Sequence, residues 1–303
     1  MTLMGDQKND GKNEVALIFT LTSSAGFYSV FWFMLKAYLY AERQSWDFYL
    51  EMGDWVYTYS KGWHDYFDSF TLWSEEYVSD YTTIHRGRHG LLPFMDKDFN
   101  FSLSDYQRAI SEVYKLKKEL VLEYDRYPVY RYAVMVRRGD KKTECSLLEP
   151  STIAQFIKNK VDGVAERGQN SDLYVQSDDI RVVEVIRRIY TSDDESRQVF
   201  SLTPDHHFGS YHHQGYLSVA ESSVKGKIVC WNEKTPEDRY HEFSQFLIGM
   251  EICRHAKIVW TDYVSNVGRF LVLSSSGKVV TFPESKDVDY KMKAFPGYEC
   301  FGF

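Results

Sequence analysis

The chain has few cysteines, the residues that form disulfides in secreted proteins and bind ions in many structural metal sites. Its 303 residues include only four cysteines, and these lack the pair spacing of metal or redox motifs: Cys145, Cys230, Cys253 and Cys300. The sequence also begins without the pattern of a secretory signal peptide. We therefore expect reduced thiols and a cytoplasmic location, because disulfides persist mainly in oxidising compartments.

Positive charge is not in excess. The chain carries 36 lysines and arginines against 43 acidic residues, which gives a net charge of −7 and a pI near 5.8. Proteins that bind nucleic acid or anionic membranes show a basic surface instead. We expect neither partner.

A long uninterrupted apolar run is missing too. Residues 15–40 have the length of a membrane anchor, but the segment Thr22–Gly26 interrupts them, Lys36 lies in their second half, and no basic flank precedes them. The sequence is better explained by a buried strand at 15–21, a glycine turn and a helix at 27–42. We expect no membrane span.

Two nucleotide-binding motifs are absent. No Gly-x-Gly-x-x-Gly follows a strand, and no Walker pattern occurs anywhere in the chain. The sequence therefore does not favour a nicotinamide-dependent enzyme.

What the chain does have is an alternation of strands and helices, which is typical of parallel α/β sheets. Its length favours two domains. We expect a leader at 1–13, an α/β domain at 14–128 and a second α/β domain at 129–303. In the first domain a helix is predicted at 103–124. In the second, strands are predicted at 131–137, 172–177, 198–202 and 257–261, and helices at 150–167, 179–191, 238–255 and 265–275.

Residues 132–144 combine an apolar strand with a cluster of charges. The strand Tyr132–Val136 runs directly into Arg137 and Arg138, and ligands bind beyond the carboxyl ends of strands in open α/β sheets. Two guanidiniums at that point suit a diphosphate. Three further ionisable residues follow in the same loop: Asp140, Lys141 and Glu144. The alternative is a surface turn whose charges pair with one another in water.

Four stretches in the same order resemble the α1,6-fucosyltransferases, the family of the bacterial nodulation-factor and animal N-glycan core fucosyltransferases. Val136–Lys141 followed by Glu144 resembles the family's Val-Arg-Arg-Thr-Asp-Lys…Glu. Gly26-Phe27 with the later Gly62-Trp63 and Phe67 is similar to its first βα unit. Leu173–Asp179 is similar to its Tyr-Leu-Ala-Thr-Asp-Asp strand end, and Ser265–Arg269 to its Ser-Gln-Val-Cys-Arg helix start.

The resemblance implies a GT-B-like fold, in which two Rossmann-like α/β domains face a cleft and the second domain holds the nucleotide-sugar. It implies an inverting glycosyltransferase that moves fucose from GDP-fucose to a glycan or glycoprotein acceptor. It also implies that no metal is needed, because arginine and a helix terminus hold the diphosphate.

The site residues follow from the matched motifs. Arg138 is expected to stabilise the leaving phosphate and Glu144 to act as the general base, aided by Lys141 and Asp140. The residues expected to bind the donor are Arg137, Gly26, Phe27, Asp178, Asp179, Tyr263, Ser265 and Asn266. Simple helix capping is the alternative for Asp178 and Asp179.

Two departures from the family pattern keep alternatives open. The chain has one residue fewer between Lys141 and Glu144, and Met135 stands where the animal enzymes have a histidine that contacts the nucleotide. Another donor such as UDP-xylose, or a non-catalytic carbohydrate- or protein-binding module on this scaffold, therefore remains an alternative.

Four histidines lie close together between the predicted elements: His206, His207, His212 and His213. Such clusters bind metals in some proteins. The surrounding segment 203–237 is irregular, however, and loops of this kind are usually solvated. We expect a solvated or acceptor-contacting loop and no metal.

Overall fold

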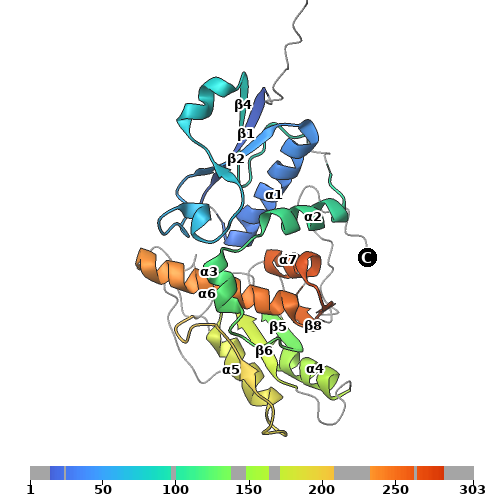
Figure 1. The fold of residues 1–303 in the computed structure, drawn as a ribbon. Helices are drawn as coiled ribbons and strands as arrows, with labels where there is room; N and C mark the ends of the chain where they lie inside the picture. Colours follow the sequence, from blue (N-terminus) through green and yellow to red (C-terminus); the bar gives the residue numbers. More distant parts are fainter. Residues whose placement is uncertain are drawn as a thin grey trace, which may run out of the picture. The chain divides into compact units, whose positions relative to one another are not determined.

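The computed structural model describes residues 14–23, 25–96, 100–137, 148–163, 171–207, 233–262 and 265–282. These form two compact units (Figure 1). The first comprises residues 14–55 and 69–109, and the second residues 56–68 and 110–282. The predicted leader, 1–13, lies outside the described residues.

The chain crosses between the units at different places from the boundary expected at residue 128. Residues 56–68 and 110–128 belong with the second unit. Backbone pairing explains why: Asp68 N donates to Lys115 O at 2.8 Å, and Lys117 N donates to Tyr66 O at 2.9 Å. The same pairing corrects the helix expected at 103–124. Residues 115–117 are extended, and two helices form instead, α2 (Leu103–Val113) and α3 (Lys118–Tyr124).

The first unit is built on a parallel sheet of order β3-β2-β1-β4. Its strands are β1 (Val15–Leu21), β2 (Asp47–Met52), β3 (Thr71–Leu72) and β4 (Thr83–Arg88). The central strand β1 is apolar and almost wholly buried, as interior strands of parallel sheets are. The helix α1 (Phe27–Gln44) packs on the sheet. The βα unit expected at 15–42 is therefore confirmed.

Strands β2, β3 and β4 lie in a stretch that the sequence did not resolve into elements. β4 reads Thr-Ile-His-Arg-Gly-Arg, and β3 has two residues. Short or polar edge strands give no clear apolar alternation. Two short 3-10 helices complete this part of the chain, η1 (Gly62–Asp65) and η2 (Glu75–Asp80).

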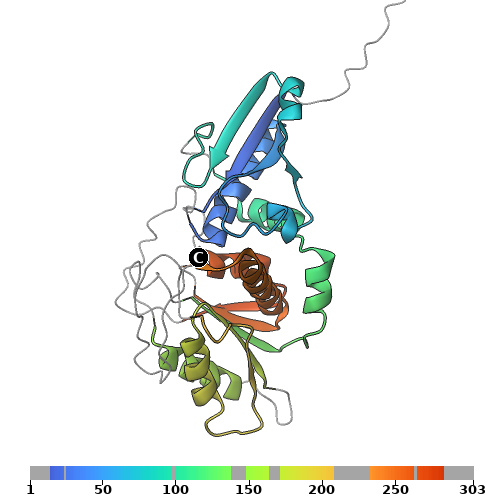
Figure 2. The same ribbon diagram turned by 90° about the vertical axis from the view of Figure 1, so that its left-hand side faces the viewer.

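The second unit is also built on a parallel sheet, of order β7-β6-β5-β8-β9. Its strands are β5 (Tyr132–Val136), β6 (Leu173–Ser177), β7 (Val199–Phe200), β8 (Ile258–Thr261) and β9 (Lys278–Thr281). Its sheet-covering helices are α4 (Pro150–Asp162), α5 (Ile180–Tyr190), α6 (Pro236–His255) and α7 (Asn266–Ser274). Helices α4 and α5 pack together on one face and α6 with α7 on the other (Figures 1 and 2). Apart from β9, these elements are the predicted ones.

Helix α6 lies very close to the sheet. A Cβ atom at Gly249 would collide with the side chains of Gln176 and Tyr174 on β6, so a larger residue there would force these buried side chains to shift. The Tyr174 hydroxyl donates to Gln176 Oε1 at 2.6 Å, which satisfies both buried groups beneath the helix.

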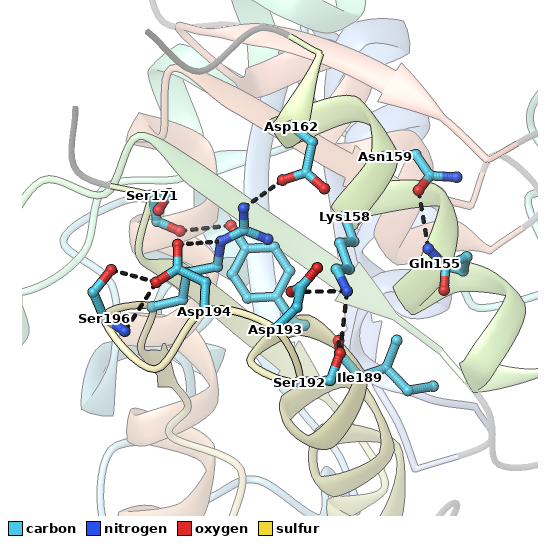
Figure 3. Close-up of polar contacts among 12 residues, drawn as sticks. Gln155, Lys158, Asn159, Asp162, Ser171, Ile189, Ser192, Asp193, Asp194 and Ser196 are labelled. Carbon is cyan, nitrogen blue, oxygen red and sulfur yellow. Dashed lines mark hydrogen bonds and ion pairs between the residues drawn. The ribbon is translucent and has the colours of Figure 1, made fainter. Parts of the chain in front are cut away.

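Polar contacts tie α4 to the turn that follows α5 (Figure 3). Lys158 Nζ lies 2.9 Å from Asp193 Oδ1 and 3.1 Å from Ser192 Oγ. Arg197 reaches Asp162 and Asp194 from the same turn. Because both helices end here, these contacts hold the edge of the sheet opposite to the carboxyl ends of its strands.

No helix in the described part of the chain is long and apolar enough to cross a membrane.

Candidate functional site

The strand order of the second unit places a topological switch point at the carboxyl edge of its sheet. The chain proceeds from β5 outward to β6 and β7, then returns to the other side of β5 to form β8 and β9. The order therefore reverses between β5 and β8, and α/β sheets bind ligands at such switch points. Arg137 follows β5, Asp178 follows β6, and the start of α7 follows β8.

Arg137 and Asp178 meet across the ends of neighbouring strands. Val136 and Ser177 are register partners, so the next residue of each strand leaves the sheet at the same level. Arg137 Nη1 lies 2.8 Å from Asp178 Oδ2, with side chains 17% and 5% exposed. The pair thus places an oriented guanidinium at the strand ends.

The adjacent carboxylate Asp179 is used differently. Its side chain caps α5 by accepting from Arg181 N at 3.0 Å. It also forms a two-pronged ion pair with the Arg181 guanidinium, at 2.8 and 2.6 Å, and both side chains are 1% exposed. The capping alternative therefore describes Asp179, and Asp178 is the carboxylate that pairs with Arg137.

A network of hydroxyl groups holds these strand ends together. Ser177 Oγ donates to Val136 O at 2.8 Å and accepts from Asp179 N at 3.1 Å. Thr203 Oγ1 accepts from Ser177 N at 3.1 Å and donates to Ser177 O at 2.9 Å. The hydroxyl groups of Ser177 and Thr203, and not only the charged side chains, therefore hold the ends of β5 and β6 in place.

The start of α7 is shaped by three residues. Ser265 is the N-cap, and its Oγ accepts from Gly268 N at 3.0 Å. Asp262 Oδ1 accepts from Ser265 N at 2.6 Å. A Cβ at position 268 would collide with the carbonyl oxygen of Asp262, so this start of α7 requires the glycine that stands where the family motif has cysteine. Ser265 is buried and is the N-cap residue of α7. Asn266 and Val267 are the first two residues of the helix.

Gly26 and Phe27 lie in the first unit, at the start of α1. Gly26 is the N-cap residue and accepts from Ser29 N and Val30 N through its carbonyl. The Phe27 ring is buried against Phe31, with centroids 5.7 Å apart. The sequence predicted that both residues bind the donor. In the structure the Phe27 ring packs in the core of this unit.

Two of the four clustered histidines converge on a glutamate that the sequence did not single out. His206 Nε2 lies 2.7 Å from Glu242 Oε1, and His207 Nε2 lies 2.7 Å from Glu242 Oε2. Lys234 Nζ pairs with the same Oε2. Burial alone would raise the pKa of Glu242, but these partners outweigh it and hold the pKa at about 2. We name these four residues the Glu242 cluster. Glu242 is 35 positions from His207 and its partnership could not be read from spacing.

Several predicted site residues lie outside the described residues. These are Arg138, Asp140, Lys141, Glu144 and Tyr263. His212 and His213 of the histidine segment also lie outside the described residues. The described residues therefore bring Arg137 and Asp178 into contact and place the start of α7 after the neighbouring strand β8, whereas the assignment of the base stays a prediction.

Neither a protein-family model nor a curated protein matches this chain. Solved structures do. Fucosyltransferase NodZ from Bradyrhizobium is 12% identical and covers 89% of this chain and 96% of its own, with a TM-score of 0.52. NodZ α1,6-fucosyltransferase co-crystallised with GDP is 11% identical, with coverage of 90% and 96% and a TM-score of 0.53. A mutant of Arabidopsis thaliana FUT1 in complex with GDP is 8% identical, with coverage of 93% and 73% and a TM-score of 0.50.

At these identities the likeness concerns the fold. The chain has the fold of the GT-B-like fucosyltransferases, with a Rossmann-like parallel sheet in each unit. The fold resemblance expected from the four motifs is therefore confirmed.

Proposed function

We propose that this protein is an inverting glycosyltransferase that takes fucose from GDP-fucose and transfers it to a glycan hydroxyl. The observation that carries the proposal is the placement of Arg137, Asp178 and the α7 start on adjacent strand ends at the switch point of the second sheet. The likeness to NodZ, which was co-crystallised with GDP, supports a guanine nucleotide-sugar as the donor.

The diphosphate is the part of the donor that needs the most stabilisation. As the bond to the sugar breaks, negative charge collects on the leaving phosphate and the sugar becomes oxocarbenium-like. In our proposal Arg137 and Arg138 neutralise that charge, and the first amides of α7 donate to the phosphate oxygens. A set of fixed positive groups of this kind takes the role that a divalent cation has in other transferases.

The acceptor hydroxyl must lose its proton as it attacks the anomeric carbon. We assign this step to Glu144, which the motif places a few residues beyond the arginines, with Lys141 and Asp140 beside it. One base and no carboxylate nucleophile means attack from the face opposite the phosphate, and hence inversion. In this scheme the first unit supplies the acceptor side.

A ligand screen tests the donor class directly. A ligand that binds only the native state raises the melting temperature, so GDP and GDP-fucose are expected to stabilise the protein more than UDP or UDP-xylose. Arg137→Ala should remove most of the GDP shift, while the matched surface variant Arg126→Ala should keep it, because Arg126 is exposed and pairs with the exposed Glu123 at the end of α3. A larger shift with UDP sugars would move the proposal to that donor class, and no shift with any nucleotide would refute it.

A further inference from the structure

We propose that His206, His207 and Glu242 form a binding site for a divalent transition metal, with Zn²⁺ the best chemical fit, in which Lys234 is a built-in competitor. The proposal is independent of the proposed transfer function. It departs from the sequence interpretation because the third ligand comes from helix α6, far along the chain from the histidines.

The geometry of the donor atoms supports a metal. One ring nitrogen from each histidine and one carboxylate oxygen of Glu242 all lie within 4.8 Å of one another. The two imidazole nitrogens face different oxygens of one carboxylate, each at 2.7 Å. In a zinc site with bonds of about 2.1 Å, neighbouring donors stand about 3.4 Å apart, so each imidazole nitrogen would need to move away from its carboxylate oxygen by less than about 1 Å. Each Nε2 would then turn a lone pair, instead of a proton, toward the centre.

Two of the three ligands stand on well-fixed backbone. Glu242 lies inside α6, the longest helix that the structure describes. His207 is fixed from both sides, since its N–H donates to Pro204 O at 2.9 Å and its carbonyl accepts from Ile180 N at 2.8 Å, at the start of α5. Both side chains are nearly buried, whereas His206 is 59% exposed. The backbone therefore holds Glu242 and His207 in place. The exposed side of the site, at His206, is open to water molecules that can complete the coordination.

The chemical types of the ligands indicate which metals this site would prefer. Two imidazoles and one carboxylate suit zinc and its neighbours, whereas magnesium and calcium prefer sites made only of oxygens. Within the described residues this is the only group of histidine, cysteine and acidic side chains close enough to bind an ion together.

Lys234 works against the metal and makes the proposal testable. Its ammonium pairs with Glu242 Oε2 and lies 3.4 Å from His207 Nε2. A divalent ion must displace this charge from the carboxylate. Removal of the lysine charge should therefore tighten metal binding, whereas removal of a ligand should weaken it. A bound ion would also link residues 205–207 to α6. The carbonyl of His207 already accepts a hydrogen bond from Ile180 N at the start of α5.

The test measures metal binding, without any enzymatic assay. Full-length protein is freed of metals with a chelator, the chelator is removed, and ZnCl₂ is titrated by calorimetry. One equivalent is expected to bind. Co²⁺ in place of zinc should give the intense visible bands of a four-coordinate site. His206→Ala should weaken zinc binding by about 100-fold or more, since even residues behind the ligands cost 10–100-fold. Lys234→Met should tighten it by about tenfold or more, in line with removal of a nearby like charge.

His241→Ala is the matched control, because His241 is an exposed histidine next to Glu242 on the same helix but outside the cluster. It should bind zinc as the unmodified chain does. His206 is exposed enough for its variant to fold, so the test does not depend on the buried ligands. Equal affinity of the unmodified chain and His206→Ala, a loss of binding in His241→Ala, or no tightening in Lys234→Met would each overturn the proposal.

Discussion

Arg137 and Asp178 are joined by a 2.8 Å ion pair that links the carboxyl ends of two neighbouring strands. The pair lies at the edge of the sheet where the strand order reverses, and it fixes the direction of the guanidinium before any ligand arrives. A positively charged group that is already oriented loses less entropy when it binds a phosphate. The ion pair is thus the feature of this chain that most directly links its fold to the diphosphate binding that we propose.

The first prediction concerns the coupling between these two residues. Asp178→Asn keeps the shape of the side chain but removes its charge, so Arg137 is no longer held in one direction. We expect GDP affinity to fall by about tenfold, which corresponds to about 1.4 kcal/mol. Addition of Asp178→Asn to Arg137→Ala should cost almost nothing more, because the two residues act as one unit. Binding measured by calorimetry in the unmodified chain, the two single variants and the double variant checks this, and strictly additive losses would mean that Asp178 contacts the donor independently.

Asp179 should behave in the opposite way to its neighbour. Its carboxylate neutralises the fully buried Arg181 and caps α5. Asp179→Ala leaves that arginine charged and without its partner in the core, which is expected to lower the free energy of unfolding by about 3–5 kcal/mol. Urea unfolding of Asp179→Ala and Asp178→Asn side by side measures the contrast. If Asp178→Asn proved the more destabilising, the division of roles between the two carboxylates would be wrong.

The different roles of Asp178 and Asp179 could not be predicted from the sequence. The Asp178-Asp179 pair could be located from the strand pattern, but which carboxylate caps the helix depends on where Arg181 and Arg137 direct their guanidiniums. Strands β5 and β6 were predictable because their apolar runs end at charges. Helix α6 was predicted from residue 238, and its start at Thr235-Pro236 was missed. The helix at 103–124 was overpredicted, since the helical spacing of its apolar residues continues through a segment that pairs with residues 66–68.

Glycine positions give a second contrast. At Gly268 a Cβ would collide with the Asp262 carbonyl, whereas at Gly26 it would meet nothing within 4 Å. Gly268→Ala should therefore lower the free energy of unfolding by about 1–3 kcal/mol through a shift of the α7 start, and with it the affinity for GDP. At Gly26 the φ is −63° and the space is open, and the stiffer unfolded chain of Gly26→Ala offsets its weaker N-cap, so its free energy of unfolding should change by less than that of Gly268→Ala. Denaturant unfolding compares them, and equal stability of the two variants would contradict the tight α7 start.

Acid stability should report on Glu251 near the end of α6. Burial alone would raise the pKa of this carboxyl, but the hydrogen bond with His255 and the charge of Arg254, 2.6 Å away, hold it below its ordinary value of 4.5. A depressed pKa in the folded state stabilises the fold above the unfolded value, and that contribution is lost as the pH falls below about 4.5. Glu251→Gln should therefore be less stable than the unmodified chain at pH 7 and should lose less stability on acidification. Thermal unfolding between pH 7 and pH 3 measures both curves. Parallel curves would show that Glu251 titrates normally.

The last prediction concerns the base, Glu144, which the motif places one residue closer to Lys141 than in the family pattern. Glu144→Gln keeps the size of the side chain but cannot accept the acceptor proton, so fucose transfer is expected to fall by about 100-fold or more. GDP-fucose affinity should barely change, because the proton acceptor serves the acceptor hydroxyl and not the diphosphate. Transfer assays combined with calorimetry of donor binding separate the two effects.

The matched variant for this experiment is Arg138→Ala, which should lower turnover to a similar extent because a charged donor to the transition state is lost. Unlike Glu144→Gln, it is also expected to weaken GDP binding. If instead Glu144→Gln weakened transfer and donor binding together, Glu144 would belong to the salt-bridge network of the phosphate-binding loop. The base would then have to be sought at Asp140, since Asp179 is already committed to Arg181 and the start of α5.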